Sequence, residues 1–214
     1  ELSVFTTFYP DHLSYYAGDI DVYLADKANI FLYQKPDDTL ILGEQMALTV
    51  IDKYESAIAS KIVVAGEKNL PDYWNLLIPG AHNRYDAALA LAAARAIGVD
   101  DAMSKEALES FLGVPGRLEL VGLTDGITFY NDTNSTTPEA TIVALHSLAE
   151  EGGARIILIM GGHDKGLEMK KLVELIGEST KHVSLLAGTG TDRVKELLPD
   201  ATVFNSLEEA FADA

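Results

Sequence analysis

The chain has 214 residues, of which 48% are hydrophobic and none is cysteine, so disulfides and thiolate metal sites are excluded. Its net charge is −17, which argues against a nucleic-acid partner because phosphate binding needs clustered Lys and Arg. No apolar run is long enough to span a bilayer, so we expect a globular protein of one or two domains with no membrane partner.

The first half of the chain predicts helices alternating with short buried strands. Apolar residues recur at helical spacing from Asp19 to Gln34, which places Lys27 within a helix. Further elements are expected in this order: a strand at 39–42, a helix at 44–54, a strand at 61–65, and helices at 83–97 and 104–112.

The segment Gly113-Val114-Pro115-Gly116 predicts a linker, because two glycines and a proline in four residues interrupt regular structure. Beyond it strands and helices alternate, which indicates a parallel sheet in a doubly wound, Rossmann-like α/β domain. Strands are expected at 127–130, 155–160, 182–186 and 202–204, and helices at 138–150, 168–178, 192–198 and 206–214. The loops at Asp132, 161–166 and 188–190 would then follow the carboxyl ends of strands, where such sheets bind ligands.

Five short motifs carry the functional signal. His12 lies in Tyr-Pro-Asp-His-Leu, and Lys27 follows fifteen residues later in Tyr-Leu-Ala-Asp-Lys-Ala. The others are Pro-Gly-Ala-His-Asn (79–83), Asn-Asp-Thr-Asn-Ser-Thr-Thr-Pro (131–138) and Gly-Gly-His-Asp-Lys-Gly (161–166). In this order and at these spacings the motifs resemble those of the Mur ligases, the ATP-dependent amide-forming enzymes of peptidoglycan synthesis. The phosphate-binding pattern G-x-x-x-x-G-K-[ST] does not occur in the chain.

The resemblance implies that residues 1–112 are the C-terminal half of a central ATPase domain. Residues 113–214 would be the C-terminal Rossmann-like domain, truncated at its end. The chain starts at Glu1 rather than Met and stops inside its last expected helix, so we expect a piece of a longer protein that is inert by itself. The implied reaction joins D-glutamate to UDP-N-acetylmuramoyl-L-alanine through an acyl phosphate, with ATP and Mg²⁺, in a cytoplasmic monomer.

The resemblance also implies a metal site. His12 and Lys27 match positions that hold Mg²⁺, and Lys27 would be carbamylated, because Mg²⁺ prefers oxygen ligands to an ammonium group. Glu1, in Glu-Leu-Ser, matches a glutamate at a second Mg²⁺ position, although the segment from Ser3 to His12 is shorter than in the family. Without the resemblance, Lys27 is a solvated helix lysine and His12 a turn histidine.

Four residues match positions that contact the nucleotide in the family: Asn83, Asp86, Arg117 and Asp132. Asp86 departs from the usual asparagine, and a carboxylate cannot donate the hydrogen bond that an amide can. Asn83 also stands at the start of a helix, where free N–H groups and the positive end of the dipole favour anions.

Two residues match positions that bind the incoming amino acid, Thr136 and Lys165, and Lys165 is also a candidate catalytic residue. Asn134 replaces a lysine that is usual two residues after the aspartate, so one cationic contact is lost. The competing interpretation of the 131–138 segment is a helix N-cap, which requires Ser, Thr or Asp in any case.

The sequence leaves two alternatives open. The longer protein could be a sibling ligase, either another Mur enzyme or a folylpolyglutamate-type enzyme. Alternatively, the chain could be a nucleotide-binding module without catalytic activity.

Overall fold

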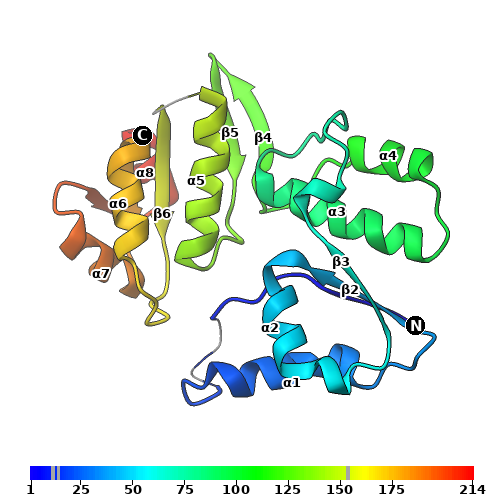
Figure 1. Cartoon of the computed structure of the whole chain (residues 1–214). Coiled ribbons are helices and arrows are strands. Elements are labelled where there is room, and N and C mark those ends of the chain that lie inside the picture. The colour runs from blue at the N-terminus through cyan, green and yellow to red at the C-terminus, as the bar shows by residue number, and fades with distance from the viewer. Residues whose placement is uncertain (11–12, 14, 153–154) are drawn as a thin grey trace. The chain divides into compact units, whose positions relative to one another are not determined.

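The computed structural model describes residues 1–10, 13, 15–152 and 155–214, and it divides into two compact units, Glu1–Leu112 and Gly113–Ala214 (Figure 1). In these residues, no helix combines the length and the apolarity that crossing a membrane would need.

Unit 1, residues Glu1–Leu112, is built on a parallel sheet with the strand order β1-β2-β3. Leu2 pairs with Thr39 at the start of β1 and β2, and Thr39 pairs with Lys61 of β3. The elements are β1 (Leu2–Phe5), α1 (Ile20–Leu32), β2 (Thr39–Gly43), α2 (Glu44–Tyr54), η1 (Glu55–Ala57), β3 (Lys61–Ala65), η2 (Glu67–Asn69), α3 (Ala81–Ala96) and α4 (Asp101–Glu109).

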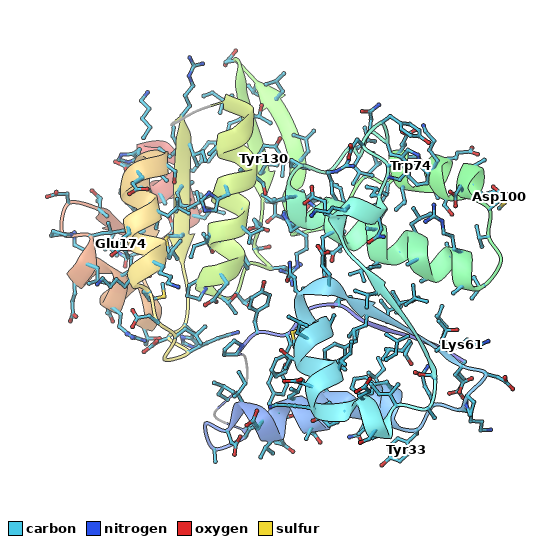
Figure 2. The ribbon with its side chains drawn as sticks, in the orientation of Figure 1. Tyr33, Lys61, Trp74, Asp100, Tyr130 and Glu174 are labelled. Atoms are coloured by element: carbon cyan, nitrogen blue, oxygen red, sulfur yellow. The ribbon has the colours of Figure 1, made fainter. Side chains whose placement is uncertain are left out.

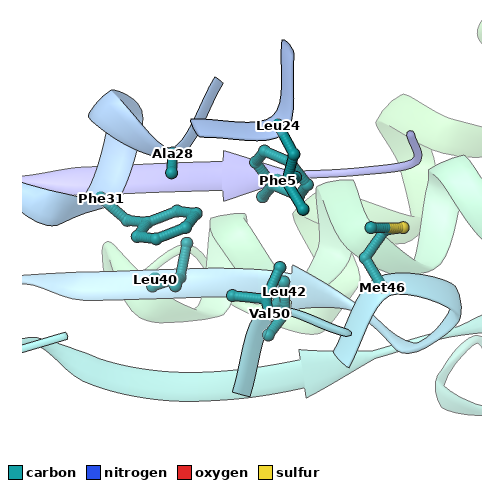
Figure 3. Close-up of a cluster of buried hydrophobic side chains, with 8 residues drawn as sticks. All are labelled: Phe5, Leu24, Ala28, Phe31, Leu40, Leu42, Met46 and Val50. Atoms are coloured by element: carbon teal, nitrogen blue, oxygen red, sulfur yellow. The ribbon is translucent and has the colours of Figure 1, made fainter. Parts of the chain in front are cut away.

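The central strand β2 separates two hydrophobic cores. Leu40 and Leu42 face one side, where they pack with Phe5 against α1 and α2 (Figure 3). Ile41 faces the other side and packs with Tyr85 of α3. Successive side chains of a strand point to opposite faces, so a strand that is covered on both faces must be apolar throughout. Leu40, Ile41 and Leu42 are each 0% exposed, which explains why this part of β2 shows no alternation of apolar and polar residues.

Local signals set the boundaries of α3 and α4. Gly80, with φ of 97°, precedes α3, and the buried Trp74 packs against this helix with Ala87 and Ala88. Asp100 lies at the start of α4 (Figure 2). Its side chain accepts a hydrogen bond from the Met103 N–H at 2.8 Å. Asp100 is thus the N-cap of α4. The helix begins at Asp101, three residues before its expected start at 104.

Unit 2, residues Gly113–Ala214, contains two sheets. β6, β7 and β8 form a parallel sheet in that order, which confirms the expected parallel α/β architecture. The elements are β4 (Glu119–Thr124), β5 (Ile127–Asn131), α5 (Pro138–Gly152), β6 (Ile156–Gly161), α6 (Lys170–Ser179), β7 (Thr180–Leu186), α7 (Thr189–Leu197), β8 (Thr202–Phe204) and α8 (Leu207–Asp213).

The strand expected at 127–130 is present as β5, but its pairing differs from the expectation. It forms an antiparallel hairpin with β4 instead of joining the parallel sheet. The turn is Asp125-Gly126, with φ of 51° and 79°, and two-residue hairpin turns of type I′ require positive φ at both positions. β4 itself, like β1, was not expected from the sequence.

Helices cover both faces of the parallel sheet of unit 2. Leu145 of α5 and Leu172 and Ile176 of α6 form a buried cluster against β6 and β7. On the other face, α8 contacts β7 and β8. There the Ser184 hydroxyl, which is 0% exposed, donates to the Asp213 carboxylate at 2.9 Å. This covering of both faces leaves the ends of the strands for the loops that carry the candidate functional residues.

Candidate functional site

In unit 1 the three parallel strands end together, and one tyrosine fastens this edge of the sheet. The Tyr85 hydroxyl of α3 donates to the Thr6 carbonyl, just after β1, at 3.1 Å. β2 ends nearby at Gly43, where a Cβ would lie 2.1 Å from both the Thr6 carbonyl oxygen and the Tyr85 hydroxyl. Burial raises the pKa of Tyr85, so this group is a neutral donor at physiological pH. Glycine at 43 is therefore required for the close packing of this edge.

Asn83 and Asp86, the two expected nucleotide contacts of unit 1, lie on the first turns of α3. The Asn83 side-chain amide donates to the Pro79 carbonyl at 2.6 Å, so it helps to fix the turn before the helix. Loss of hydration raises the pKa of Asp86 above its usual value, and the smaller effect of the nearby His82 opposes this increase. The Asp86 side chain itself lies on the exposed side of α3.

The expected metal ligands are only partly described. His12 lies outside the described residues, Glu1 is the exposed residue before β1, and Lys27 is an exposed residue of α1. The Lys27 ammonium lies 5.4 Å from the centre of the Tyr23 ring, a cation–π distance. Among the described residues, no group of three or more His, Asp or Glu side chains gathers as a metal site. The described donors alone therefore do not fit Mg²⁺, and the metal site stays a prediction that depends on His12 and on carbamylation of Lys27.

In unit 2, Arg117 and Asp132 come together through the backbone. Asp132 follows β5, and its carboxylate accepts a hydrogen bond from the Leu118 N–H at 3.0 Å. Arg117 precedes Leu118 in the chain, so this hydrogen bond fixes its backbone close to the loop that carries Asp132. The Arg117 side chain itself is exposed. Thr136 is also exposed, further along the same loop and before α5 begins at Pro138.

Lys165 lies in the loop between β6 and α6, and this loop is fastened to the start of α7. The Gly190 N–H donates to the Gly162 carbonyl at 2.9 Å, and the Asp164 N–H donates to the Thr189 hydroxyl at 3.0 Å. A Cβ on Gly188 would lie 2.6 Å from the Gly162 carbonyl oxygen, so glycine permits this approach. The structure therefore assigns the Gly188-Thr189-Gly190 segment to the start of α7 and to this loop contact.

An ion pair strengthens the same loop. The Arg193 guanidinium of α7 lies 2.7 Å from the Asp164 carboxylate, and the Gly166 N–H donates to that carboxylate at 2.8 Å. The Gly166 hydrogen bond and then Arg193 hold the pKa of Asp164 below its usual value. The backbone is therefore fixed by hydrogen bonds on both sides of Lys165, at the Asp164 N–H and at the Gly166 N–H.

Sequence reasoning missed the residues that support these loops. Thr189 and Arg193 support the Lys165 loop, Glu119 supports the Arg117 turn, and Tyr85 supports the edge of unit 1. Two local signals existed: Glu119 stands two residues after Arg117, and Thr189 lies in the 188–190 loop that was expected at the same edge of the sheet as residues 161–166. The contacts that Thr189, Arg193 and Tyr85 make join residues far apart in the sequence, and no local pattern reveals such contacts.

Comparisons with known proteins agree with this arrangement. Residues 116–214 match the family model described as Mur ligase, glutamate ligase domain. The chain is similar to the UDP-N-acetylmuramoyl-L-alanine--L-glutamate ligase of Xanthomonas euvesicatoria pv. vesicatoria (31% identity over 209 residues, 92% of this chain and 44% of the relative). It is similar as well to the UDP-N-acetylmuramoylalanine--D-glutamate ligase of Aquifex aeolicus (33% over 221 residues, 98% and 52%). The chain thus spans about half the length of these curated relatives.

Solved structures with the same fold include MurF from Acinetobacter baumannii, with a TM-score of 0.77 and 19% identity, covering 99% of this chain and 52% of that one. The folylpolyglutamate synthase of Mycobacterium tuberculosis complexed with ADP has a TM-score of 0.74 and 17% identity, covering 100% and 55%. At such identities the likeness concerns the fold alone.

Proposed function

Because the chain belongs to the Mur ligase family, we propose that the protein containing it joins glutamate to UDP-N-acetylmuramoyl-L-alanine at the expense of ATP. One observation carries this proposal: relatives that match 92–98% of the chain at 31–33% identity are named as glutamate ligases acting on that nucleotide sugar. We further propose that the reaction proceeds in the cytoplasm, through an acyl phosphate that the amine of glutamate attacks.

The two units have different proposed roles. Unit 1 would be the second half of the central ATPase domain, with Asn83 and Asp86 facing the nucleotide. Unit 2 would be the C-terminal domain, in which Arg117 and Asp132 contact ATP while Thr136 and Lys165 bind glutamate. Bound Mg²⁺ would neutralise phosphate charge, and His12, Glu1 and a carbamylated Lys27 would hold it. The remaining contribution of the protein is positioning, which the fixed loops of unit 2 favour.

The configuration of the glutamate is the finer part of the proposal. The motif from Asn131 to Pro138 favours D-glutamate, and relatives such as the Aquifex protein are named for it. L-glutamate is the second candidate, because the Xanthomonas relatives are named for that enantiomer at similar identity. Both candidates use the same carboxylate-binding role of Lys165, so the chemistry of the loop does not decide between them.

The test is phosphate release by the full-length protein with ATP, Mg²⁺ and UDP-N-acetylmuramoyl-L-alanine. The amines to compare are D-glutamate, L-glutamate, L-lysine, meso-diaminopimelate and D-alanyl-D-alanine. We expect release with D-glutamate. Release with L-glutamate alone would correct the configuration, and release with one of the other amines would make the protein a sibling ligase. If none supports turnover in a folded protein, the proposal fails in favour of a non-catalytic nucleotide-binding module.

The Lys165 assignment has its own control. Replacement Lys165→Met removes the ammonium and keeps much of the apolar stem, so we expect the KM for glutamate to rise about tenfold or more, since charge-assisted hydrogen bonds to carboxylates are strong. Lys181→Met changes an exposed lysine near the start of β7, whereas the Lys165 loop follows the end of the neighbouring strand β6. This control should leave the KM for glutamate unchanged. Equal behaviour of the two variants would remove Lys165 from the site.

A further inference from the structure

The turn that presents Arg117 has an unusual backbone. Pro115 and Gly116 are the central residues of a tight turn that closes with a hydrogen bond from the Arg117 N–H to the Val114 carbonyl at 3.0 Å. Gly116 has φ of 74°, as position three of a type II turn requires. Leu118 has φ of 41°, although it is not glycine, and its side chain is only 6% exposed. Arg117 therefore lies between two left-handed residues, an arrangement that persists only where the surroundings hold it.

The loop after β5 supplies partners for both carbonyl groups of this turn through one residue, Asn134. Its side-chain amide donates to the Pro115 carbonyl at 3.0 Å, and its backbone N–H donates to the Gly116 carbonyl at 2.9 Å. The neighbouring donors are met by carboxylates. Asp132 accepts from the Leu118 N–H at 3.0 Å, and Glu119 accepts from the Gly116 N–H at 2.9 Å.

The turn and the loop lie so close at position 116 that a Cβ there would displace the Asn134 side-chain amide. A Cβ on Gly116 would lie 2.8 Å from the Asn134 amide nitrogen and 3.1 Å from the Thr133 hydroxyl. Glu119 also accepts from the Asn131 side-chain amide at 3.0 Å, so it ties the turn to the end of β5 as well. The turn 114–117 and the loop 131–136 are thus fastened at several points within unit 2.

We propose that Asn134 is a positioning residue that fixes Arg117, with Asp132 and Glu119 supporting it. This inference rests on the proposed function, in which Arg117 contacts ATP and Thr136 binds glutamate. Asn134 then holds the nucleotide contact and the amino-acid contact in a fixed relation, because Arg117 lies on the turn and Thr136 on the loop. Asn134 acts through the hydrogen bond that its side-chain amide donates to the Pro115 carbonyl, and not through a charge.

The chemistry of Asn134 allows a sharp test. Asn134→Asp keeps the size of the side chain but replaces its NH₂ donor with an oxygen, so two acceptors would face each other at Pro115. Asn134→Ala removes the donor without adding charge. Thr133→Ala is the matched control, since it changes an exposed side chain of the same loop and keeps every hydrogen bond from Asn134.

The experiment measures two properties of the full-length protein and of each variant. The first is backbone hydrogen exchange, resolved at residues 116–118 and 134. The second is the dissociation constant for ATP with Mg²⁺, together with the KM values for ATP and glutamate. For both Asn134 variants we expect faster exchange at these amides and roughly tenfold weaker ATP binding, with both KM values raised. Thr133→Ala should match the unsubstituted protein.

Two results would overturn the inference: unchanged exchange in both Asn134 variants, or faster exchange with unchanged ATP binding and unchanged KM values. The second result would show a structural contact without a positioning role. Failure of the proposed function is distinguishable, because the unsubstituted protein would then show no turnover with any amine. In that case ATP binding and exchange still decide whether Asn134 fixes Arg117.

Discussion

At the scale of single residues, short polar side chains fix the loops that carry the candidate functional groups. Asp164 is the clearest case, because it accepts from the Gly166 N–H of its own loop and pairs with Arg193 of α7. Lys165 lies between Asp164 and Gly166 in the chain. The sequence motif identified Lys165, but the partner of Asp164 lies 29 residues away and gives no local signal.

The first prediction concerns Arg193→Gln. Removing the guanidinium should raise the pKa of Asp164, because a cationic partner favours the ionised carboxylate. The pKa should stay below the usual value for aspartate, since the larger effect, the Gly166 hydrogen bond, remains. A carboxyl NMR titration measures this, with Arg193→Lys as the control that keeps the charge. A pKa of Asp164 that is unchanged in Arg193→Gln would show that the ion pair does not form in solution.

The same shift fixes the sign of a pH dependence. A carboxyl whose pKa is lower in the folded than in the unfolded protein stabilises the fold above its unfolded pKa, here near 3.8. That contribution is lost as the pH falls through the lower folded pKa. The Asp164 interactions therefore contribute fully at neutral pH and weaken only under strongly acidic conditions.

At the scale of elements, two glycines with equal space around them should respond oppositely to alanine. Nothing lies within 4 Å of a Cβ built on Gly126 or on Gly177. Gly126 has φ of 79° in the β4–β5 turn, so Gly126→Ala should destabilise the protein by about 1 kcal/mol. Gly177 lies within α6, so Gly177→Ala should stabilise it by about 0.5–1 kcal/mol.

Urea unfolding of both variants beside the unsubstituted protein checks this pair. Stability changes of the same sign would mean that something other than backbone conformation dominates at one of the two sites.

Most elements could be predicted from the sequence, and the exceptions have physical causes. α2, β3 and β8 match the expected ranges, because apolar residues mark them in the sequence. The expectation that β3 is buried was wrong, since Val63 and Val64 are 42% and 44% exposed.

β4 was missed because its apolar side chains are exposed on both of its faces, so Leu120, Val121 and Leu123 show no regular alternation with polar residues. The Asp125-Gly126 pair was the available signal. Pairing partners and loop contacts depend on distant residues, which periodicity does not encode.

At the scale of the whole molecule, the net charge of −17 should make stability depend on salt. Repulsion among like charges destabilises a compact chain, and added salt screens it. We expect the Tm at pH 7 to rise by about 2–4 °C between low salt and roughly 0.2 M NaCl. The increase should shrink near the isoelectric point of about 4.5, which serves as the control. A Tm at pH 7 that is independent of salt would show that the acidic residues are already locally compensated.

The β4–β5 hairpin also has a consequence for the order in which the chain acquires its structure. Thr124 pairs with Ile127, and only two residues separate them. In unit 1, Leu2 pairs with Thr39, and the segment between them includes the whole of α1. Short loops close quickly, and parallel pairing over long crossovers is slow. We therefore expect the hairpin to be an early folding nucleus. The Arg117 turn leads directly into β4, so we expect it to form together with the hairpin, before either parallel sheet is complete.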